Sequence, residues 1–438
     1  MELLKSWTTD HPVVMALVRV VCVVVVQFAL LVVGIWWERR VLAFMQDRLG
    51  PNRVATITWS RTSRLVPGFL KGKKQGFAGL FQPLMDGLKL FMKEDVTPTA
   101  IDRAIYFIAP AIAMFPAFAL TATVVWGPKE WIWQYFTPIA DINVAILYLF
   151  AVSSLGVYGI VLAGYSSNNK YSLLGGLRSS AQLISYELAM SMALASMVLL
   201  TGSLRMTQMV EAQQGPLWGS VPFLQNWFVL TPFGAVAAVV FLICMVAETN
   251  RAPFDLPEAE NELIAGYHTE YSSMKFAAFF MGEYAAMVAY GMIFATIFLG
   301  GFNAVPVNWH YLAQYSPIFG VLGNLNVWFA PLLFIGKVVA VFTAFIWIRA
   351  TLPRLRYDQL MSLGWRSLLP LAVTNFLVVA LWIVCTEVYG KAIGWLSVLA
   401  AVAVIFVTFY GLARAARKSG YALEKREVLL VDPGKASL

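Results

Sequence analysis

The sequence predicts an all-α protein, a polytopic bundle of transmembrane helices with amphipathic helices at the membrane interface. Hydrophobic residues make up 59% of the 438 residues and charged residues only 13%, about half the charged fraction of a soluble globular chain. So few charged side chains cannot cover a soluble surface of this size. The apolar residues also gather in runs of about 20, the length that a helix needs to cross the hydrocarbon core. These runs are too long and too unbroken for the strands of a membrane β-barrel.

Nine apolar runs predict nine membrane spans. They cover residues 13–37, 104–126, 142–164, 180–202, 231–247, 276–301, 328–348, 366–387 and 392–413. The first run is not a cleaved signal peptide, because it is long and has no small-residue cleavage site. It ends in Trp36, Trp37, Glu38, Arg39 and Arg40, which are typical of an interfacial anchor followed by stop-transfer charges.

Lysine and arginine orient the predicted bundle. With the N-terminus outside, the inside segments hold 26 of the 32 basic residues. These segments are 38–103, 165–179, 248–275, 349–366 and 414–438. The opposite orientation would reverse this ratio, so the positive-inside rule places the N-terminus outside and the basic C-terminal tail in the cytoplasm. The outside loop 302–327 has no charged side chain.

The first inside segment contains two unusual stretches. Residues 79–94 predict an amphipathic helix in the interface, because apolar and charged side chains fall on separate helical faces. The apolar face carries Leu80, Leu84, Leu88 and Phe91, and the charged face carries Asp86, Lys89 and Lys93. The stretch 50–76 has six basic residues and no acid. It suits binding to anionic lipid headgroups or docking to an acidic partner, and both interpretations stay open.

Cysteine and histidine offer no metal framework. Cys22, Cys244 and Cys385 lie in apolar runs without CxxC spacing, and the three histidines are scattered. The phosphate-binding and dinucleotide-binding glycine motifs are also absent from the sequence. We therefore expect this chain to bind no nucleotide or metal of its own, and we expect no nucleic-acid partner.

Three ionisable residues stand out well inside the apolar runs, namely Glu187, Glu283 and Lys337. Each costs about 2.5–3.5 kcal/mol near the centre of a bilayer, so such residues usually have a function. A structural ion pair between helices is the plain alternative. Three such residues, two of them acidic, favour a proton or ion pathway.

Acidic residues crowd between the fifth and sixth predicted spans. Seven of the 24 acids lie between 248 and 283, namely Glu248, Asp255, Glu258, Glu260, Glu262, Glu270 and Glu283. Only Arg251 and Lys275 oppose them. A solvated acidic loop is one interpretation. The interleaved Leu263, Tyr267 and Tyr271 instead favour packing against the bundle, where crowding and burial raise carboxyl pKa values and couple the titrations. Such a cluster suits a relay that passes protons or senses a change of charge.

Three inside segments resemble one family. They are residues 38–42 (ERRVL) with 46–53 (QDRLGPNR), residues 247–263 (AETNRAPFDLPEAENEL) and residues 354–361 (RLRYDQLM). These long motifs, in this order, are similar to those of the H subunit of respiratory complex I, the NADH–quinone oxidoreductase. The resemblance covers roughly residues 13–387.

The resemblance implies a role for the chain and for particular residues. In that family the protein anchors the peripheral arm and forms most of the quinone tunnel, whose mouth lies between the first and sixth spans and the amphipathic helix. It also starts a chain of buried carboxylates. The quinone-path positions match Arg39, Arg48, Asp86, Lys89, Arg251 and Asp255. The proton-coupling positions match Glu187, Glu248, Glu258, Glu260, Glu262, Glu270, Glu283 and Lys337. No catalytic redox residue is implied on this chain.

The chain departs from the family pattern in two places. About twenty extra residues near 55–75 interrupt the first inside loop, and a ninth span with a basic tail follows the usual eight. We therefore divide the chain into a membrane domain at 1–390, with the basic insertion and an acidic coupling loop at 248–275, and an added segment at 391–438.

The resemblance also predicts the surroundings of the chain. Quinone is the expected substrate, and FMN and iron–sulfur clusters are expected on partner subunits of the peripheral arm. The other expected partners are the antiporter-like membrane subunits and lipid, in the inner membrane of a cell. Related subunits of hydrogenases or of ferredoxin- or F420-dependent complexes are an alternative. A stand-alone ion-coupled transporter is a further one, although it predicts an internal repeat that we do not find.

Overall fold

The computed structural model describes most of the chain. The described residues are 12–52, 79–128, 140–218, 221–255 and 264–390, with short pieces at 57–58 and 74–75 and scattered helical positions between 396 and 414. Helices dominate this part, and its strands form only two small two-stranded sheets. The prediction of an all-α architecture is therefore confirmed.

Seven helical segments are long and apolar enough to cross a membrane. They are Val13–Met45, Arg103–Thr123, Ala145–Ser166, Lys170–Thr201, Ser273–Phe298, Ala330–Thr351 and Tyr357–Tyr389. Each coincides with one of the nine predicted spans. The predicted span at 231–247 falls on the shorter apolar helix α8 (Pro232–Glu248). The ninth, at 392–413, lies mostly outside the described residues, and the orientation across the membrane stays a prediction.

Several helices extend beyond the predicted apolar runs, because capping residues and not hydrophobicity set their ends. Helix α6 (Lys170–Thr201) begins ten residues before the predicted span, where the side chain of Asn169 caps it by accepting from the amide of Tyr171. It ends at Gly202, which adopts a left-handed conformation suited to glycine. The first turns of α6 contain polar residues. Such residues are compatible with a helix, but a search for apolar runs does not include them.

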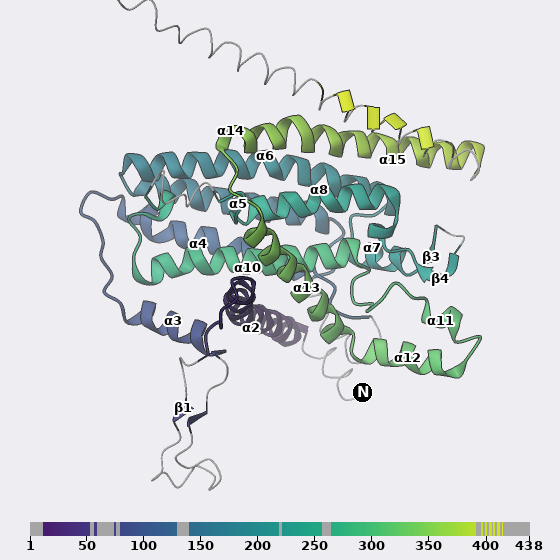
Figure 1. Cartoon of the computed structure of the whole chain (residues 1–438), viewed down its shortest axis with the longest axis horizontal. Coiled ribbons are helices and arrows are strands. Elements are labelled where there is room, and N and C mark those ends of the chain that lie inside the picture. The colour runs from purple at the N-terminus through teal and green to yellow at the C-terminus, as the bar shows by residue number, and fades with distance from the viewer. Residues whose placement is uncertain are drawn as a thin grey trace, which may run out of the picture.

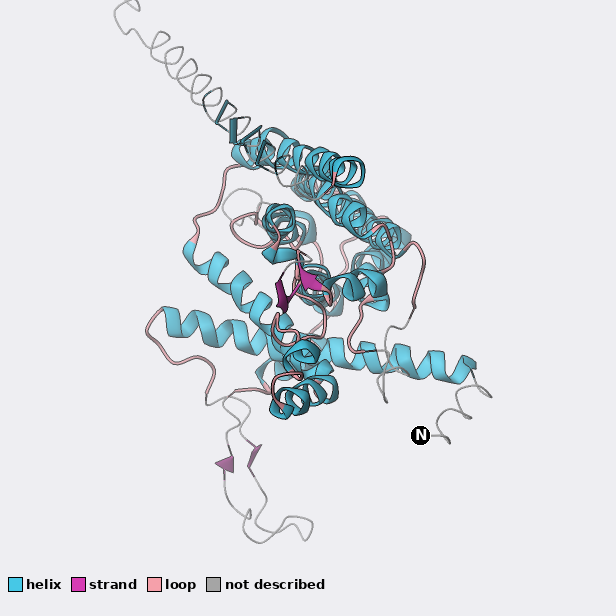
Figure 2. Cartoon of the chain, turned by 90° about the vertical axis from the view of Figure 1, so that its right-hand side faces the viewer, coloured by secondary structure: helices cyan, strands magenta, loops and turns pink. Residues whose placement is uncertain are grey.

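The long helices pack in two directions. Helices α4 (Arg103–Ala119), α5 (Ala145–Ser166), α6, α8 and α10 (Ser273–Phe298) run side by side (Figure 1). Helix α2 (Pro12–Met45) crosses them steeply, since it is nearly end-on in Figure 1 and seen along its length in Figure 2. The central helix is α10, which contacts α2, α4, α8 and α13 (Ala330–Thr351).

A polar residue fastens the steeply tilted helix to the bundle. Gln27, in the middle of α2, donates from its amide nitrogen to the carbonyl oxygens of Ala117 (2.8 Å) and Ala285 (3.3 Å). Its own oxygen accepts from the hydroxyl of Thr121. The side chain is fully buried. These bonds join α2 to α4 and α10, as buried amides do between membrane helices.

The remaining elements are short. On the end that the sequence predicts to be inside, helix α3 (Gln82–Met92) lies in the predicted amphipathic stretch, and β1 (Ile57–Thr58) pairs antiparallel with β2 (Lys74–Gln75) beyond it (Figure 1). Most of the basic insertion lies outside the described residues. The other end of the bundle holds α7 (Met206–Gln213), β3 (Pro216–Leu217), β4 (Val221–Gln225), α11 (Trp309–Leu312) and α12 (Pro317–Trp328). The 3₁₀ turns are η1 (Leu120–Thr123), η3 (Phe228–Leu230) and η4 (Gly266–His268), and α14 (Tyr357–Ser362) continues through the π-helical turn η5 (Leu363–Leu368) into α15 (Leu369–Tyr389).

Candidate functional site

A large, mainly apolar pocket lies between α2, α3 and α10, at the end of the bundle that the sequence predicts to be inside. Its volume is about 570 Å³. The walls include Phe28, Leu31 and Ile35 from α2 and Phe276, Phe280 and Met281 from α10. The charged side chains among its lining residues are Arg39, Asp86 and Lys89. An apolar cavity with a polar edge suits a ligand that has both an apolar body and a polar group.

An ion pair joins two of the predicted quinone-path residues at this pocket. The guanidinium of Arg39 lies 2.7 Å from the carboxylate of Asp86, which also accepts from the amide of Gln82. The bond links the end of α2 to α3. Arg48, predicted with them, lies beyond α2, where its side chain is exposed and donates to Gln46. It does not line the pocket.

Phe280 connects the pocket to a buried arginine. The guanidinium of Arg251 lies 5.4 Å from the ring centre of Phe280 and 4.3 Å from that of Tyr284. These are cation–π distances. The phenol of Tyr284 also interacts with the carboxyl group of Glu38, which forms an ion pair with Arg349 of α13. Arg251 is therefore held by the aromatic side chains of α10, one turn apart.

Gln182 of α6 holds the loop that carries Arg251. Its amide nitrogen donates to the carbonyl oxygens of Ala247 (2.9 Å) and Phe254 (3.0 Å), on either side of the arginine. Asp255, at the end of this loop, lies 3.0 Å from the guanidinium of Arg354. The loop is thus fixed to α6 on one side and to the segment after α13 on the other.

Arg251 meets Glu283 inside the bundle. Its guanidinium lies 3.5 Å from one carboxylate oxygen of Glu283, and the phenol of Tyr267 donates to the other at 3.0 Å. All three side chains are buried. Tyr267 belongs to η4, in the acidic loop, and Gly175 of α6 permits its close approach, because a Cβ there would lie 2.9 Å from the Tyr267 nitrogen.

A second group of acids lies along an internal cavity of about 70 Å³ that Glu283 and Tyr267 also line. That volume has room for a few water molecules. Glu248, Tyr290 and Ser153 of α5 line the same cavity. The phenol of Tyr290 interacts with both the carboxyl group of Glu248 and the hydroxyl of Ser153.

Glu187 completes this second group. One of its carboxylate oxygens accepts from the hydroxyls of Ser153 (2.9 Å) and Ser154 (2.6 Å). Ser153 therefore touches both Glu187 and Tyr290. The polar groups follow the order Arg251, Glu283, Tyr267, cavity, Glu248, Tyr290, Ser153 and Glu187.

The other predicted acids lie elsewhere. Glu258, Glu260 and Glu262 lie outside the described residues. Glu270 is half-buried in the loop before α10, where its carboxylate accepts from the amide of Asn169 at 2.8 Å. In the described part of the chain, no three His, Cys, Asp or Glu side chains gather as metal ligands would.

Lys337 lies at the opposite end of α10 from this network. Its ammonium donates to the carbonyl oxygens of Leu299 and Gly301, and it lies 4.0 Å from the ring centre of Trp227. The carbonyl end of a helix carries partial negative charge, so α10 itself stabilises this cation. The structure does not bring Lys337 together with the predicted acids.

Several residues of the network escaped the sequence reasoning. The connecting groups are Tyr267, Tyr290, Ser153, Ser154 and Gln182, all neutral. A search for ionisable residues within apolar runs passes over them. Polar residues inside a predicted span would have been a usable signal for Ser153, Ser154 and Gln182, as for Gln27.

Known proteins resemble this chain over most of its length. The family model for NADH dehydrogenase matches residues 17–380. The NADH-quinone oxidoreductase H subunit 2 of Koribacter versatilis is 41% identical over 381 residues, which cover 84% of this chain and 96% of that relative. The H subunit of Flavobacterium johnsoniae is 39% identical, covering 81% and 92%, and the H subunit 1 of Geobacter metallireducens is 43% identical, covering 79% and 89%.

Proposed function

The chain belongs to the family of NADH-quinone oxidoreductase H subunits, and from this premise we propose that it walls the quinone path and couples quinone reduction to proton translocation. It is a multi-pass membrane subunit of an oxidoreductase complex. The observation that carries the proposal is a series of polar groups that runs from the inside pocket through Arg251 to the buried Glu283, and across a small cavity to the half-buried Glu248 and Glu187.

The pocket between α2, α3 and α10 is the quinone entrance. Its apolar walls match the isoprenoid tail of a quinone, and Arg39, Asp86 and Lys89 stand where the polar headgroup passes. The mouth is formed by the same three elements that the family resemblance implies. Arg48 and Asp255 support neighbouring segments in this proposal and do not line the pocket.

Reduction of the quinone changes the charge near Arg251. A two-electron reduction needs two protons, and until they arrive negative charge develops on the quinone oxygens. Arg251 is attracted to that charge at the expense of its attraction to Glu283. A carboxylate that loses a nearby cation in a buried site binds a proton more readily. Glu283 thus takes up a proton in response to the redox step.

The cavity then provides the route onward. Tyr267, Glu283, Glu248 and Tyr290 all line it, and hydroxyl groups continue to Glu187. Hydroxyls and water both accept and donate protons, so a proton released by Glu283 passes to Glu248 and then to Glu187. Glu258, Glu260, Glu262 and Glu270 supply protons to this route from the inside.

The redox centres lie on other chains in this proposal. FMN and iron–sulfur clusters of the peripheral arm deliver electrons to the quinone. The antiporter-like subunits respond to the change of protonation at Glu187. The location is the inner membrane of a bacterial cell. The position of Lys337 at the carbonyl end of α10 leaves it out of the proton route.

The test is a Glu283→Gln substitution in the assembled complex. After reconstitution in liposomes, NADH-driven quinone reduction and proton uptake into the lumen are measured together. We expect the ratio of pumped protons to reduced quinone to fall strongly, because the amide cannot take up a proton. Glu387→Gln is the matched control, since Glu387 is an exposed acid on α15. A normal ratio in Glu283→Gln would overturn the relay.

A further inference from the structure

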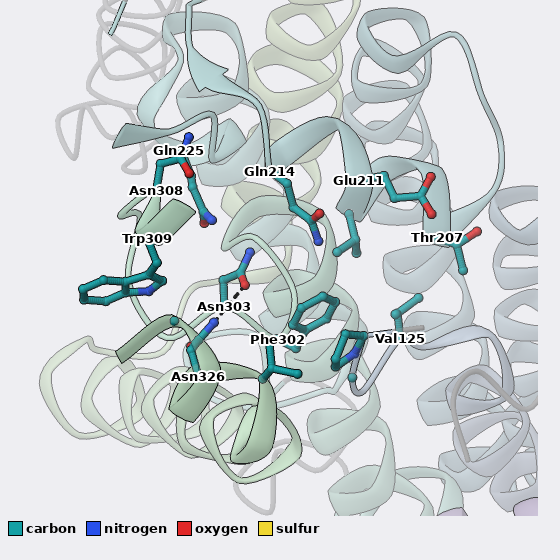
Figure 3. A pocket seen from close by; sticks show the side chains of 15 residues that line it. Val125, Thr207, Glu211, Gln214, Gln225, Phe302, Asn303, Asn308, Trp309 and Asn326 are labelled. Carbon is teal, nitrogen blue, oxygen red and sulfur yellow. Dashed lines mark hydrogen bonds between the residues drawn. The ribbon is translucent and has the colours of Figure 1, made fainter. Parts of the chain in front are cut away.

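A separate cavity lies at the outer end of the bundle, and the proposed function does not use it. Its volume is about 270 Å³, and fifteen residues line it (Figure 3). They come from α7, β4, α11, α12, the loop after α10 and the segment after η1. The quinone pocket lies at the inside end, so this cavity is a distinct site.

Buried amides form one wall of the cavity. Gln225, Asn303 and Asn326 are each more than nine-tenths buried. Asn326 is bonded within the protein at both polar atoms, since its oxygen accepts from the amide of Ala304 and its nitrogen donates to the oxygen of Asn303, both at 3.1 Å. Figure 3 shows this last bond as a dashed line. These bonds orient Asn303 so that its nitrogen remains for another acceptor.

Gln225 and one further amide, Asn308, have the same arrangement as Asn303. The oxygen of Gln225 accepts from the indole of Trp227 at 3.3 Å, and the oxygen of Asn308 accepts from the amide of Tyr311 at 3.4 Å. Both leave a nitrogen donor at the cavity. Trp309, another lining residue, contributes the surface of its ring; its indole nitrogen is buried behind that surface and is not counted among these donors. The cavity therefore presents several hydrogen-bond donors that a bound molecule would satisfy.

The charged residues that line the cavity determine which net charge a bound molecule can carry. Glu211 is its one charged lining residue, and the described lining has neither lysine nor arginine. A bound anion would be repelled by Glu211 and would enter without a counter-ion, which is unfavourable away from water. Hydroxyl groups are neutral, accept from amide nitrogens and donate to a carboxylate. Phe302 and Trp309 add apolar surface for the carbon side of such a molecule.

We propose that this outer cavity binds a small neutral polyol of about monosaccharide size. The same chemistry occurs in a free sugar and in the sugar headgroup of a glycolipid. The buried amides recognise hydroxyl oxygens, Glu211 accepts from hydroxyl groups, and Trp309 covers one face of the ring.

Saturation-transfer NMR can measure the binding of glucose, which serves as the probe. The experiment uses the whole complex in nanodiscs of phosphatidylethanolamine and phosphatidylglycerol. The complex is purified without sugar-based detergent, which could occupy the cavity. We expect a clear glucose signal and a much weaker one for glucuronate, which is anionic. Trp309→Phe, which replaces the bicyclic indole with a smaller ring and removes its N–H, and Asn303→Leu should each lower the glucose signal at least fivefold without changing quinone reduction. Trp218→Phe, at an exposed tryptophan outside the cavity, is the control and should retain the signal.

Added glucosyl diacylglycerol identifies the source. If it suppresses the glucose signal, the cavity takes a lipid headgroup, and if it does not, the cavity takes the free sugar; both results support the proposal. No glucose signal in the parent complex would overturn it. So would an equal signal in both cavity variants, or stronger binding of the zwitterion glycine betaine than of glucose.

Discussion

The guanidinium of Arg251 lies 3.5 Å from the carboxylate of Glu283, and both side chains are less than one-tenth exposed. This pair stands between the aromatic wall of the proposed quinone pocket and the cavity that Glu248 also lines. Desolvation of both ions offsets much of their attraction, so the pair contributes little net stability. Its sensitivity to a third charge nearby is what suits it to coupling.

Removing the arginine tests this pair. Arg251→Met should destabilise the protein by about 3–5 kcal/mol, because the Glu283 charge stays buried without this cation. Quinone reduction should fall about tenfold or more, the effect of losing a charged contact worth about 1.5–3 kcal/mol. Thermal unfolding of the purified complex and its quinone reductase rate measure the two effects. Adding Glu283→Gln should restore stability but not proton pumping, and a double variant as unstable as Arg251→Met would contradict the pairing.

The ion pair at the pocket mouth should behave differently. Arg39 and Asp86 are 45% and 35% exposed, and exposed pairs contribute only about 0–1 kcal/mol. Arg39→Glu or Asp86→Arg should therefore leave the unfolding temperature nearly unchanged and raise the KM for quinone several-fold. The double exchange, Arg39→Glu with Asp86→Arg, should recover much of the KM. A change in kcat alone would place the pair outside the entry path.

The sequence predicts the positions of the helices better than it predicts the contacts within the site. Apolar runs predict seven of the long helices, because lipid exposure and burial both demand apolar residues over a fixed length. The apolar runs miss the start of α6, because the cap at Asn169 and not hydrophobicity determines where this helix begins. The apolar run at 231–247 correctly predicts the position of α8, but α8 is shorter than the seven helical segments that are long enough to cross a membrane.

The contacts of the site could not be predicted from the sequence. Arg251 and Glu283 are recognisable as unusual charges, yet their pairing depends on how α10 packs against the loop after α8. Ser153 and Glu187 likewise meet only because α5 and α6 are neighbours. A single sequence gives the face of a helix but not which helix faces it. The neutral partners Tyr267 and Tyr290 carry no charge signal at all.

Tyr290 offers a test of the link between Glu248 and Glu187. Tyr290→Phe removes only the hydroxyl that interacts with Glu248 and Ser153. We expect proton pumping per quinone to fall while quinone reduction stays near its normal rate, because the pocket is untouched. Ser153→Ala should have the same effect, and the double variant should be no worse than either single one, since both interrupt one route. Additive losses would indicate two separate routes.

Tyr271, in the loop before α10, predicts a dependence of stability on alkaline pH. Burial raises the pKa of its phenol from 10.0 to about 12, although a hydrogen bond with Ser166 partly opposes this. The folded state therefore favours the neutral phenol. That contribution to stability is complete below pH 10 and is lost as the pH rises through 12. Between these values the unfolding temperature of Tyr271→Phe should fall less than that of the parent complex. Tyr389→Phe, at an exposed phenol, should follow the parent.

Gly175 of α6 tests whether the position of Tyr267 matters for coupling. A Cβ at Gly175 would lie 2.8 Å from the Cα of Gly266 and 2.9 Å from the nitrogen of Tyr267, so Gly175→Ala must displace η4. Such overpacking costs about 1–3 kcal/mol, and it moves the phenol that donates to Glu283. We expect fewer protons pumped per quinone reduced.

Two further variants separate this effect from a general loss of stability. Gly336→Ala is the matched control in α13, since a Cβ there meets nothing within 4 Å and alanine favours the helix by about 1 kcal/mol. Its pumping ratio should stay normal. Tyr267→Phe removes the hydroxyl without moving the loop. If Gly175→Ala acts through Tyr267, combining it with Tyr267→Phe should lower the ratio no further than the worse single variant does. A further fall would show that the loop shift acts through another contact, for instance by moving the backbone of η4 away from α6.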